Sequence, residues 1–296
     1  MNKSFAERIF NALNYSLILL GTLLVFYPFY YCVMLSFNNG RDAEKGGIYF
    51  WPRVFTLENY QFVFSNDSIL VAARNSVMRT VAGTILALLV TSMFAYAISK
   101  KDLLFRKAYM VLGLITMYFG GGLIPYFLLI KSLGLYNNFL VYIIPNLFAM
   151  FNALIFLSFF RTIPDSLEES AKLDGANDIY IYFKIIVPLS KAVFATIALF
   201  VGVGQWNSWF DTMLYASSKP ELETLSHILT KMITAQRFID EISSKRQMGV
   251  GVASSGMTTT ALMLSTMVIT AFPIIMLYPF LQKYFVTGIM IGSVKG

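Results

Sequence analysis

The chain has 296 residues, of which 57% are hydrophobic and 13% charged, and its formal net charge is +7. Soluble domains carry about 25% charged residues, and the mean hydropathy here is +0.64, so the composition excludes a soluble enzyme. The single cysteine, Cys32, excludes an intramolecular disulfide, and the single histidine, His227, excludes a multi-histidine metal site. The positive charge forms no dense basic block, so no nucleic-acid partner is expected.

Six stretches without Asp, Glu, Lys or Arg are each at least 18 residues long. A transmembrane helix needs about 17–25 mostly apolar residues. We therefore expect an all-α, polytopic membrane protein with six transmembrane helices in a single transmembrane domain over residues 1–296. The expected spans are 15–36, 77–98, 108–130, 139–160, 193–215 and 257–280.

The N-terminal basic residues Lys3 and Arg8 precede an apolar run, as they would in a signal peptide. The run continues through Phe37 with no Ala-x-Ala cleavage site, so we interpret it as a retained first helix. The polar segment 37–70 that follows is predicted to be a loop.

Orientation follows from the short links, because Lys and Arg are enriched in short cytoplasmic loops. The link 99–107 contains four of these residues, whereas the link 131–138 contains only Lys131. We therefore place 99–107 and both termini in the cytoplasm, and the segments 37–70 and 216–255 outside.

The segment 161–190 has the pattern of two short helices joined by a sharp turn. Ser166 and Glu169 have the spacing of a capping box at a helix start, and Gly175 permits a left-handed helix end. Asn177 or Asp178 is predicted to cap a second helix that ends before Pro188.

Two interpretations of this segment are open. It could rest on lipid headgroups as a pair of amphipathic helices, or it could dock its apolar face into a partner protein. The apolar residues available for such docking are Leu167, Ala171, Leu173 and Ala176.

The string Glu169-Ser170-Ala171, three residues, Gly175, nine residues, then Ile185-x-Val187-Pro188 resembles a known motif. It is similar to the EAA loop of permease subunits of binding-protein-dependent ABC importers, with Ser170 and Val187 in place of Ala and Leu. Asp174-Gly175-Ala176 resembles the carbohydrate-importer version, and the tail 282–296 is similar to that of MalG-type sugar permeases. The stretches 120–125, 133–135 and 206–209 resemble the LplC-like and YtcP-like branch, which handles complex oligosaccharides.

This resemblance implies a MalG-like type I ABC importer permease fold in the bacterial plasma membrane, with an EAA coupling helix at 166–178. The implied partners are a MalF-type second permease subunit, two ATPase subunits, an extracellular solute-binding protein, an oligosaccharide substrate and membrane lipid. The chain itself would be no enzyme and would bind no cofactor, since ATP and Mg²⁺ would be bound by the ATPase subunits. The nucleotide-binding motif G-x-x-x-x-G-K-[ST] is absent from its sequence. The implied ATPase-coupling residues are Glu168, Glu169, Ser170, Ala171, Asp174, Gly175, Ala176 and Pro188, with a further tail contact at Gly292 and Lys295.

Polar residues inside the fifth span are costly if they face lipid, so they are expected to face the bundle or a water-filled cavity. The alternative is that the two Trp residues form an interfacial belt and Asn207 joins helices. The glycines of the third span predict a break that either lines the pathway or permits close packing. The candidate substrate pathway comprises Gln205, Trp206, Asn207, Trp209, Asp211, Gly121 and Gly122.

Two further features are less specific. Arg74 and Arg79 could face an acidic sugar, but snorkelling to the membrane boundary is the favoured interpretation. Apolar residues recur with helical spacing in 216–255, which predicts an amphipathic helix carrying His227 on its surface.

Other classes of function fit less well. An ion-coupled secondary transporter usually places ionisable groups at the membrane midplane, but the predicted spans hold almost no carboxylate, and Asp211 lies near a span end. An intramembrane enzyme would need a nucleophile–base or metal set, and the motifs H-E-x-x-H and G-x-S-x-G are absent. A purely structural scaffold would not require the helix–glycine–helix segment.

Overall fold

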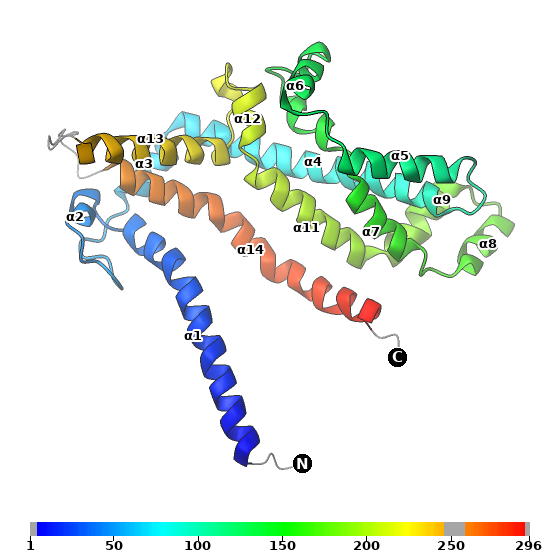
Figure 1. Ribbon diagram of the computed structural model, residues 1–296, viewed down its shortest axis with the longest axis horizontal. Coiled ribbons are helices and arrows are strands. Elements are labelled where there is room, and N and C mark those ends of the chain that lie inside the picture. The colour runs from blue at the N-terminus through cyan, green and yellow to red at the C-terminus, as the bar shows by residue number, and fades with distance from the viewer. Residues whose placement is uncertain (1–4, 246–257, 294–296) are drawn as a thin grey trace. The chain divides into compact units, whose positions relative to one another are not determined.

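The computed structural model describes residues 5–245 and 258–293 (Figure 1). These residues are almost entirely helical, and the β pairing among them is an isolated bridge between Asn38 and Phe55. The chain divides into two compact units, one made of Met1–Asp67 and Leu229–Phe272 and the other of Ser68–Ile228 and Pro273–Gly296.

The first unit begins with α1 (Phe5–Ser36), a helix that continues through Pro28. Segment 37–70, predicted as a loop, instead holds α2 (Gly40–Glu44), α3 (Glu58–Ser65) and the start of α4. Buried polar side chains organise it, because Asn59 donates hydrogen bonds to the carbonyls of Ser36 and Asn38 at 2.9 and 3.0 Å. These backbone groups would otherwise be left unsatisfied at the end of α1.

The second unit contains α4 (Asp67–Ser99), whose buried residues Ala95, Tyr96 and Ile98 share a core with residues 150–160 and 191–207. Its other elements are α5 (Arg106–Tyr118), α6 (Leu123–Ser132), 3₁₀ turns at Phe139–Tyr142, Ile144–Asn146 and Pro220–Leu222, α7 (Met150–Phe160), α8 (Asp165–Leu173), α9 (Asp178–Ile181), a π-helical turn (Tyr182–Ile186), α10 (Val187–Leu189), α11 (Lys191–Asn207) and α12 (Phe210–Tyr215). Two longer helices, α13 (Leu225–Lys245) and α14 (Thr259–Ser293), pass from one unit to the other.

The core of the second unit lies between α4, α7, α9 and α11. Phe156 on α7, Ile181 on α9 and Ile197 on α11 are all fully buried there. A hydrogen bond of 2.6 Å between the hydroxyls of Ser92 and Tyr182 joins α4 to the π-helical turn. Because these elements pack closely, they hold the residues of α4, α7 and α11 in fixed positions.

Within residues 5–245 and 258–293, three helices are long and apolar enough to cross a membrane, namely Phe5–Ser36, Asp67–Ser99 and Thr259–Leu277. Three bent helix pairs are also apolar enough to be single spans, which gives up to six. Arg106–Tyr118 and Leu123–Ser132 meet at 116°, and the predicted glycine break lies between them, with Gly122 at a φ of +85°. Only a residue without Cβ adopts this backbone conformation at no steric cost.

The fourth and fifth spans differ from the prediction of continuous helices. The fourth is bent by 47° between its 3₁₀ turns and α7. The fifth is interrupted at Ser208 and Trp209, between α11 and α12. The second helical stretch of segment 161–190 does not end before Pro188, because α9, the π-helical turn and α10 follow one another without a break and Pro188 lies within α10.

Candidate functional site

A cavity of about 400 Å³ lies among α4, α6, α7, α11 and α12 in the second unit. Its wall combines one arginine and one aspartate with amides, aromatic rings and small residues. The lining residues are Arg79, Tyr126, Val141, Pro145, Asn146, Ala149, Asn152, Val201, Gly204, Gln205, Ser208, Phe210, Asp211 and Tyr215.

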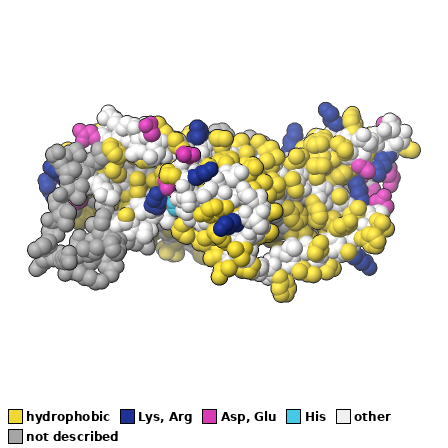
Figure 2. Space-filling view, turned by 90° about the horizontal axis from the view of Figure 1, so that it is seen from above, with side chains coloured by type: hydrophobic (Ala, Val, Ile, Leu, Met, Phe, Trp, Pro, Cys, Tyr) yellow, Lys and Arg dark blue, Asp and Glu magenta, His cyan; other side chains and the backbone are white. Residues whose placement is uncertain are grey.

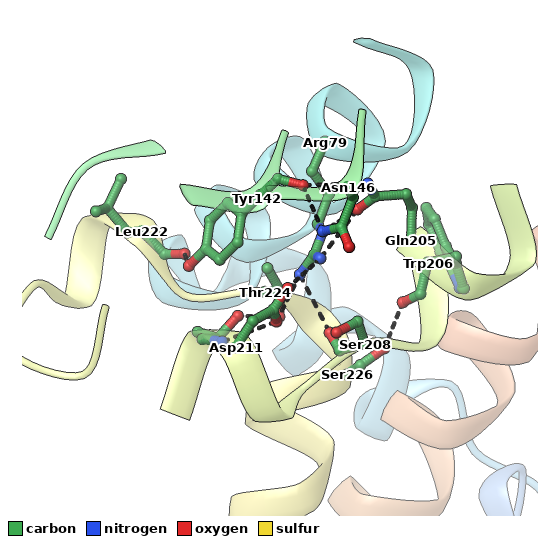
Figure 3. Close-up of polar contacts among 11 residues, drawn as sticks. Arg79, Tyr142, Asn146, Gln205, Trp206, Ser208, Asp211, Leu222, Thr224 and Ser226 are labelled. Carbon is green, nitrogen blue, oxygen red and sulfur yellow. Dashed lines mark hydrogen bonds and ion pairs between the residues drawn. The ribbon is translucent and has the colours of Figure 1, made fainter. Parts of the chain in front are cut away.

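The guanidinium of Arg79 is the centre of the polar contacts at this cavity (Figure 3). Its two terminal nitrogens bind the two carboxylate oxygens of Asp211 at 3.1 and 2.5 Å, which is a bidentate ion pair. Its Nε and Nη2 donate to the side-chain oxygen of Gln205 at 3.2 and 3.0 Å. The Tyr142 ring lies against it, 4.4 Å from the guanidinium carbon to the ring centre.

The interruption of the fifth span explains why an arginine is buried here. Where α11 ends, helix carbonyls lose their partners, and Arg79 donates to the carbonyl of Ser208 at 3.2 Å. Asp211, in the first turn of α12, balances the positive charge and suits the positive end of that helix. The prediction that Arg79 snorkels is therefore wrong, because its side chain is 1% exposed.

Gln205 is held in place from both sides. Its Nε2 donates to the carbonyl of Tyr142 at 3.1 Å while its oxygen accepts from Arg79. A Cβ added at Gly83 would lie 2.7 Å from the same Nε2, so only glycine lets α4 approach this closely. The hydroxyl of Tyr142 in turn donates to the carbonyl of Leu222 at 2.7 Å.

A second candidate site is the charged end of the same unit, where α8 lies (Figures 1 and 2). The link 99–107 is tied to α8 by two ion pairs, Lys100 with Glu168 and Lys101 with Asp165, the latter at 2.7 Å. The hydrogen bond between Lys101 and Asp165 lowers the pKa of the carboxyl and raises that of the amine. A hollow of about 460 Å³ lies between the link and the helix.

The ends of α8 agree with the prediction at one terminus only. The capping box between Ser166 and Glu169 does not form, because α8 begins at Asp165 after Pro164 and has no side-chain cap. At the other end Gly175 has a φ of +83°, and the amide of Ala176 donates to the carbonyl of Ala171 at 2.9 Å. This is a Schellman motif, which ends a helix sharply.

The second short helix starts as predicted. The side chain of Asn177 accepts a hydrogen bond of 2.8 Å from the amide of Tyr180 and caps α9. An ion pair of 3.2 Å between Lys172 and Asp178 spans the turn between the two helices. The turn is thus constrained by backbone and side-chain contacts together.

The apolar residues of this segment do not form one docking face, contrary to the expectation. Ala171 and Ala176 pack against the core of the second unit. Leu167 and Leu173 point outward, 42% and 90% exposed. Glu169 is also exposed and makes no ion pair within the described part of the chain.

Curated relatives identify the chain. It is 36% identical over 290 residues to "Polygalacturonan/rhamnogalacturonan transport system permease protein YtcP" of Bacillus subtilis, covering 98% of this chain and 99% of the relative. It is 34% identical to "Protein LplC" of the same organism, covering 100% and 98%. The chain belongs to the carbohydrate ABC transporter permeases. No protein-family profile matches it.

A solved structure supports the assignment of the permease fold. The structure is described as a bacterial ABC transporter involved in the import of the acidic polysaccharide alginate. The TM-score is 0.85 at 27% identity, over 96% of this chain and 99% of the other. The permease is therefore an all-α, polytopic membrane protein, and as a permease subunit it is not itself an enzyme.

Of the seven predicted pathway residues, two line the cavity and five do not. Gln205 and Asp211 line the cavity. Trp206 is buried, and its carbonyl accepts a hydrogen bond of 2.6 Å from Ser226 instead. The remaining four, none of which lines the cavity, are Asn207, Trp209, Gly121 and Gly122.

Sequence reasoning missed several cavity residues, above all the amides Asn146 and Asn152. Both interrupt the otherwise apolar run 139–160, so the cost of an amide in lipid was a usable signal. Tyr126 and Tyr215 were indistinguishable from the other aromatic residues of the chain. Their ring centres are 6.4 Å apart at one side of the cavity.

Two further predictions concern the segment 216–255 and the tail. The predicted amphipathic helix is present as α13, and its first apolar residues, Leu225 and Ile228, are buried. His227 is 6% exposed and is not a surface residue. Gly292 lies near the end of α14, whereas Lys295 lies outside the described residues.

Within the described residues, no three His, Cys, Asp or Glu side chains come together in a way that could hold a metal ion.

Proposed function

We propose that this permease forms half of the translocation pathway of an ATP-driven, binding-protein-dependent importer of an oligosaccharide. Its partners would be a second permease subunit, two ATPase subunits and an extracellular solute-binding protein. The acidic polymers in the names of YtcP and the alginate transporter favour an acidic oligosaccharide as the substrate class.

The proposed orientation places the link 99–107, α8 and both termini in the cytoplasm. The four basic residues of that link support this orientation, because short basic links stay on the cytoplasmic side. The chain then crosses the membrane six times, with the bent pairs within residues 106–132 and 139–160 each counted as one span and the fifth span at 193–215.

The observation that carries the proposal is the construction of α8. Its inward side packs on the core through Ala171 and is tied down by the Lys100–Glu168 and Lys101–Asp165 ion pairs. A segment held in this way transmits a displacement to α4 and α7, whereas a free loop would absorb it. In the proposed mechanism, closure of the ATPase pair moves α8 and rocks the second unit by a largely rigid-body motion.

The outward side of α8 is the proposed ATPase-docking surface. A leucine that is 90% exposed, as Leu173 is, contributes almost nothing to the stability of the subunit itself. Its burial in a groove of a partner would be favourable. Glu169, exposed beside it, is proposed to pair with a basic group of the ATPase.

The test compares Leu173→Ser and Gly175→Asp with the control Leu133→Ser. Leu133, like Leu173, is an exposed leucine at the C-terminal end of a helix, but it lies on the proposed outer link. We expect both α8 variants to insert and fold normally, yet to lose co-purification with the ATPase subunits and ATP-dependent uptake. The control should keep both.

Normal uptake by both α8 variants would contradict the coupling role. Uptake that needs no ATPase and is abolished by an ionophore would instead favour an ion-coupled secondary transporter. Uptake is therefore measured with and without an ionophore, in cells that contain or lack the ATPase.

A further inference from the structure

We infer that the cavity among α4, α6, α7, α11 and α12 is a sugar subsite that binds an uncharged face of the oligosaccharide. It would take pyranose hydroxyls and C–H surfaces and would not select for the carboxylate of an acidic sugar. The inference rests on the proposed function and deepens it.

The first argument is that the positive charge of Arg79 is already paired with Asp211 and that its N–H groups already have acceptors. Its five N–H groups have five contacts, namely two to Asp211, two to Gln205 and one to the Ser208 carbonyl. Arginine has no further donor, and its side chain is 1% exposed. A ligand carboxylate would have to displace Asp211, so the cavity is electrically balanced before any ligand enters.

The second argument is the chemistry of the remaining wall. Asn152 lies half-buried on α7, a helix otherwise built almost wholly from apolar residues, and its amide has no hydrogen bond within the described part of the chain. An amide in an apolar helix is costly unless it finds a polar partner. Tyr126 and Phe210 present partly exposed rings to the same space.

Aromatic rings and an amide around a cavity of this size suit a carbohydrate ring. Small-molecule sites have volumes of about 300–1,000 Å³ and combine apolar walls with a few polar groups. The cavity has about 400 Å³. The rings would cover C–H faces, and Asn152 would exchange hydrogen bonds with hydroxyls.

Gly204 offers a way to fill the cavity without disturbing the fold. It lines the cavity within α11, and a Cβ added there would meet no atom within 4 Å. Gly204→Trp should therefore fold and occupy the subsite. Phe200→Trp is the matched control, because Phe200 lies one turn earlier on α11, partly exposed and outside the cavity.

The experiment measures uptake by the full complex in liposomes with its binding protein, using trigalacturonate, its methyl ester and maltotriose as probes. We expect Gly204→Trp to lower uptake of every probe that the wild type imports at least about tenfold, and Phe200→Trp to leave it unchanged. Asn152→Ala should raise KM about three- to tenfold, the value of one lost hydrogen bond. The ratio of mutant to wild-type KM should be the same for the acid and its ester.

Each other outcome overturns the inference. Normal uptake by Gly204→Trp would exclude a ligand from the cavity. Failure of that variant to assemble with the second permease would mean that a partner side chain fills it. A KM effect of Asn152→Ala confined to the acid would mean that the site reads the carboxylate. If the wild type imports none of the three probes, the subsite inference fails, whereas the proposed coupling through α8 is tested separately by co-purification with the ATPase subunits.

Discussion

Removing the Arg79 side chain should destabilise the permease much more than removing any exposed charge. Arg79→Met would leave the carboxylate of Asp211, 16% exposed, beside an apolar residue in the interior. It would also remove the partners of the Gln205 oxygen and of the Ser208 carbonyl. Breaking a buried ion pair from one side costs about 3–5 kcal/mol, since the remaining charge is unpaired.

The assay is the apparent melting temperature of the purified subunit in detergent. A loss of about 3–5 kcal/mol corresponds to a shift on the order of 10 °C for a chain of this size. Arg74→Met is the matched control, because Arg74 is an exposed arginine on the same helix. Exposed substitutions of this kind change stability by about 0.5 kcal/mol or less.

A double variant tests the physical reason. Arg79→Met combined with Asp211→Asn leaves no unpaired buried charge, so it should recover about half or more of the lost stability. The reasoning would be refuted if Arg79→Met had the same melting temperature as Arg74→Met. It would also be refuted if the double variant were no more stable than Arg79→Met alone.

Two other predictions concern the core and the link to α8. Phe156→Ala should cost about 3–5 kcal/mol, because Phe156 is fully buried, whereas Phe151→Ala on the exposed face of the same helix should cost far less; equal melting temperatures would contradict the core assignment. The Lys101–Asp165 pair loses its contribution only as pH falls through the lowered Asp165 pKa, below about 4, or rises through the raised Lys101 pKa, above about 10.5. Lys101→Met should therefore have the same small effect on melting at about pH 6 and about pH 9, and an effect that changes between them would show that another group titrates.

The sequence by itself determined the features that depend on local chemistry. Uncharged stretches of sufficient length indicated where helices cross a membrane, because the cost of an unpaired charge in lipid is independent of the rest of the fold. Gly122 and Gly175 indicated a break and a turn, since both need a backbone conformation that glycine adopts freely. Asn177 indicated a helix start through contacts within three residues.

Features that join distant parts of the chain were decided only by the tertiary structure. Arg79 and Asp211 are 132 positions apart, and nothing near either residue distinguishes a buried ion pair from two boundary charges. The same holds for Ala171, whose inward packing depends on a core assembled from four helices. Asn152 stands out in the sequence as an amide in an apolar run, but the space beside it is formed only when α6, α11 and α12 come together. Local preferences determine where helices begin, break and end, whereas the partner of a buried charge is set by which helices pack together.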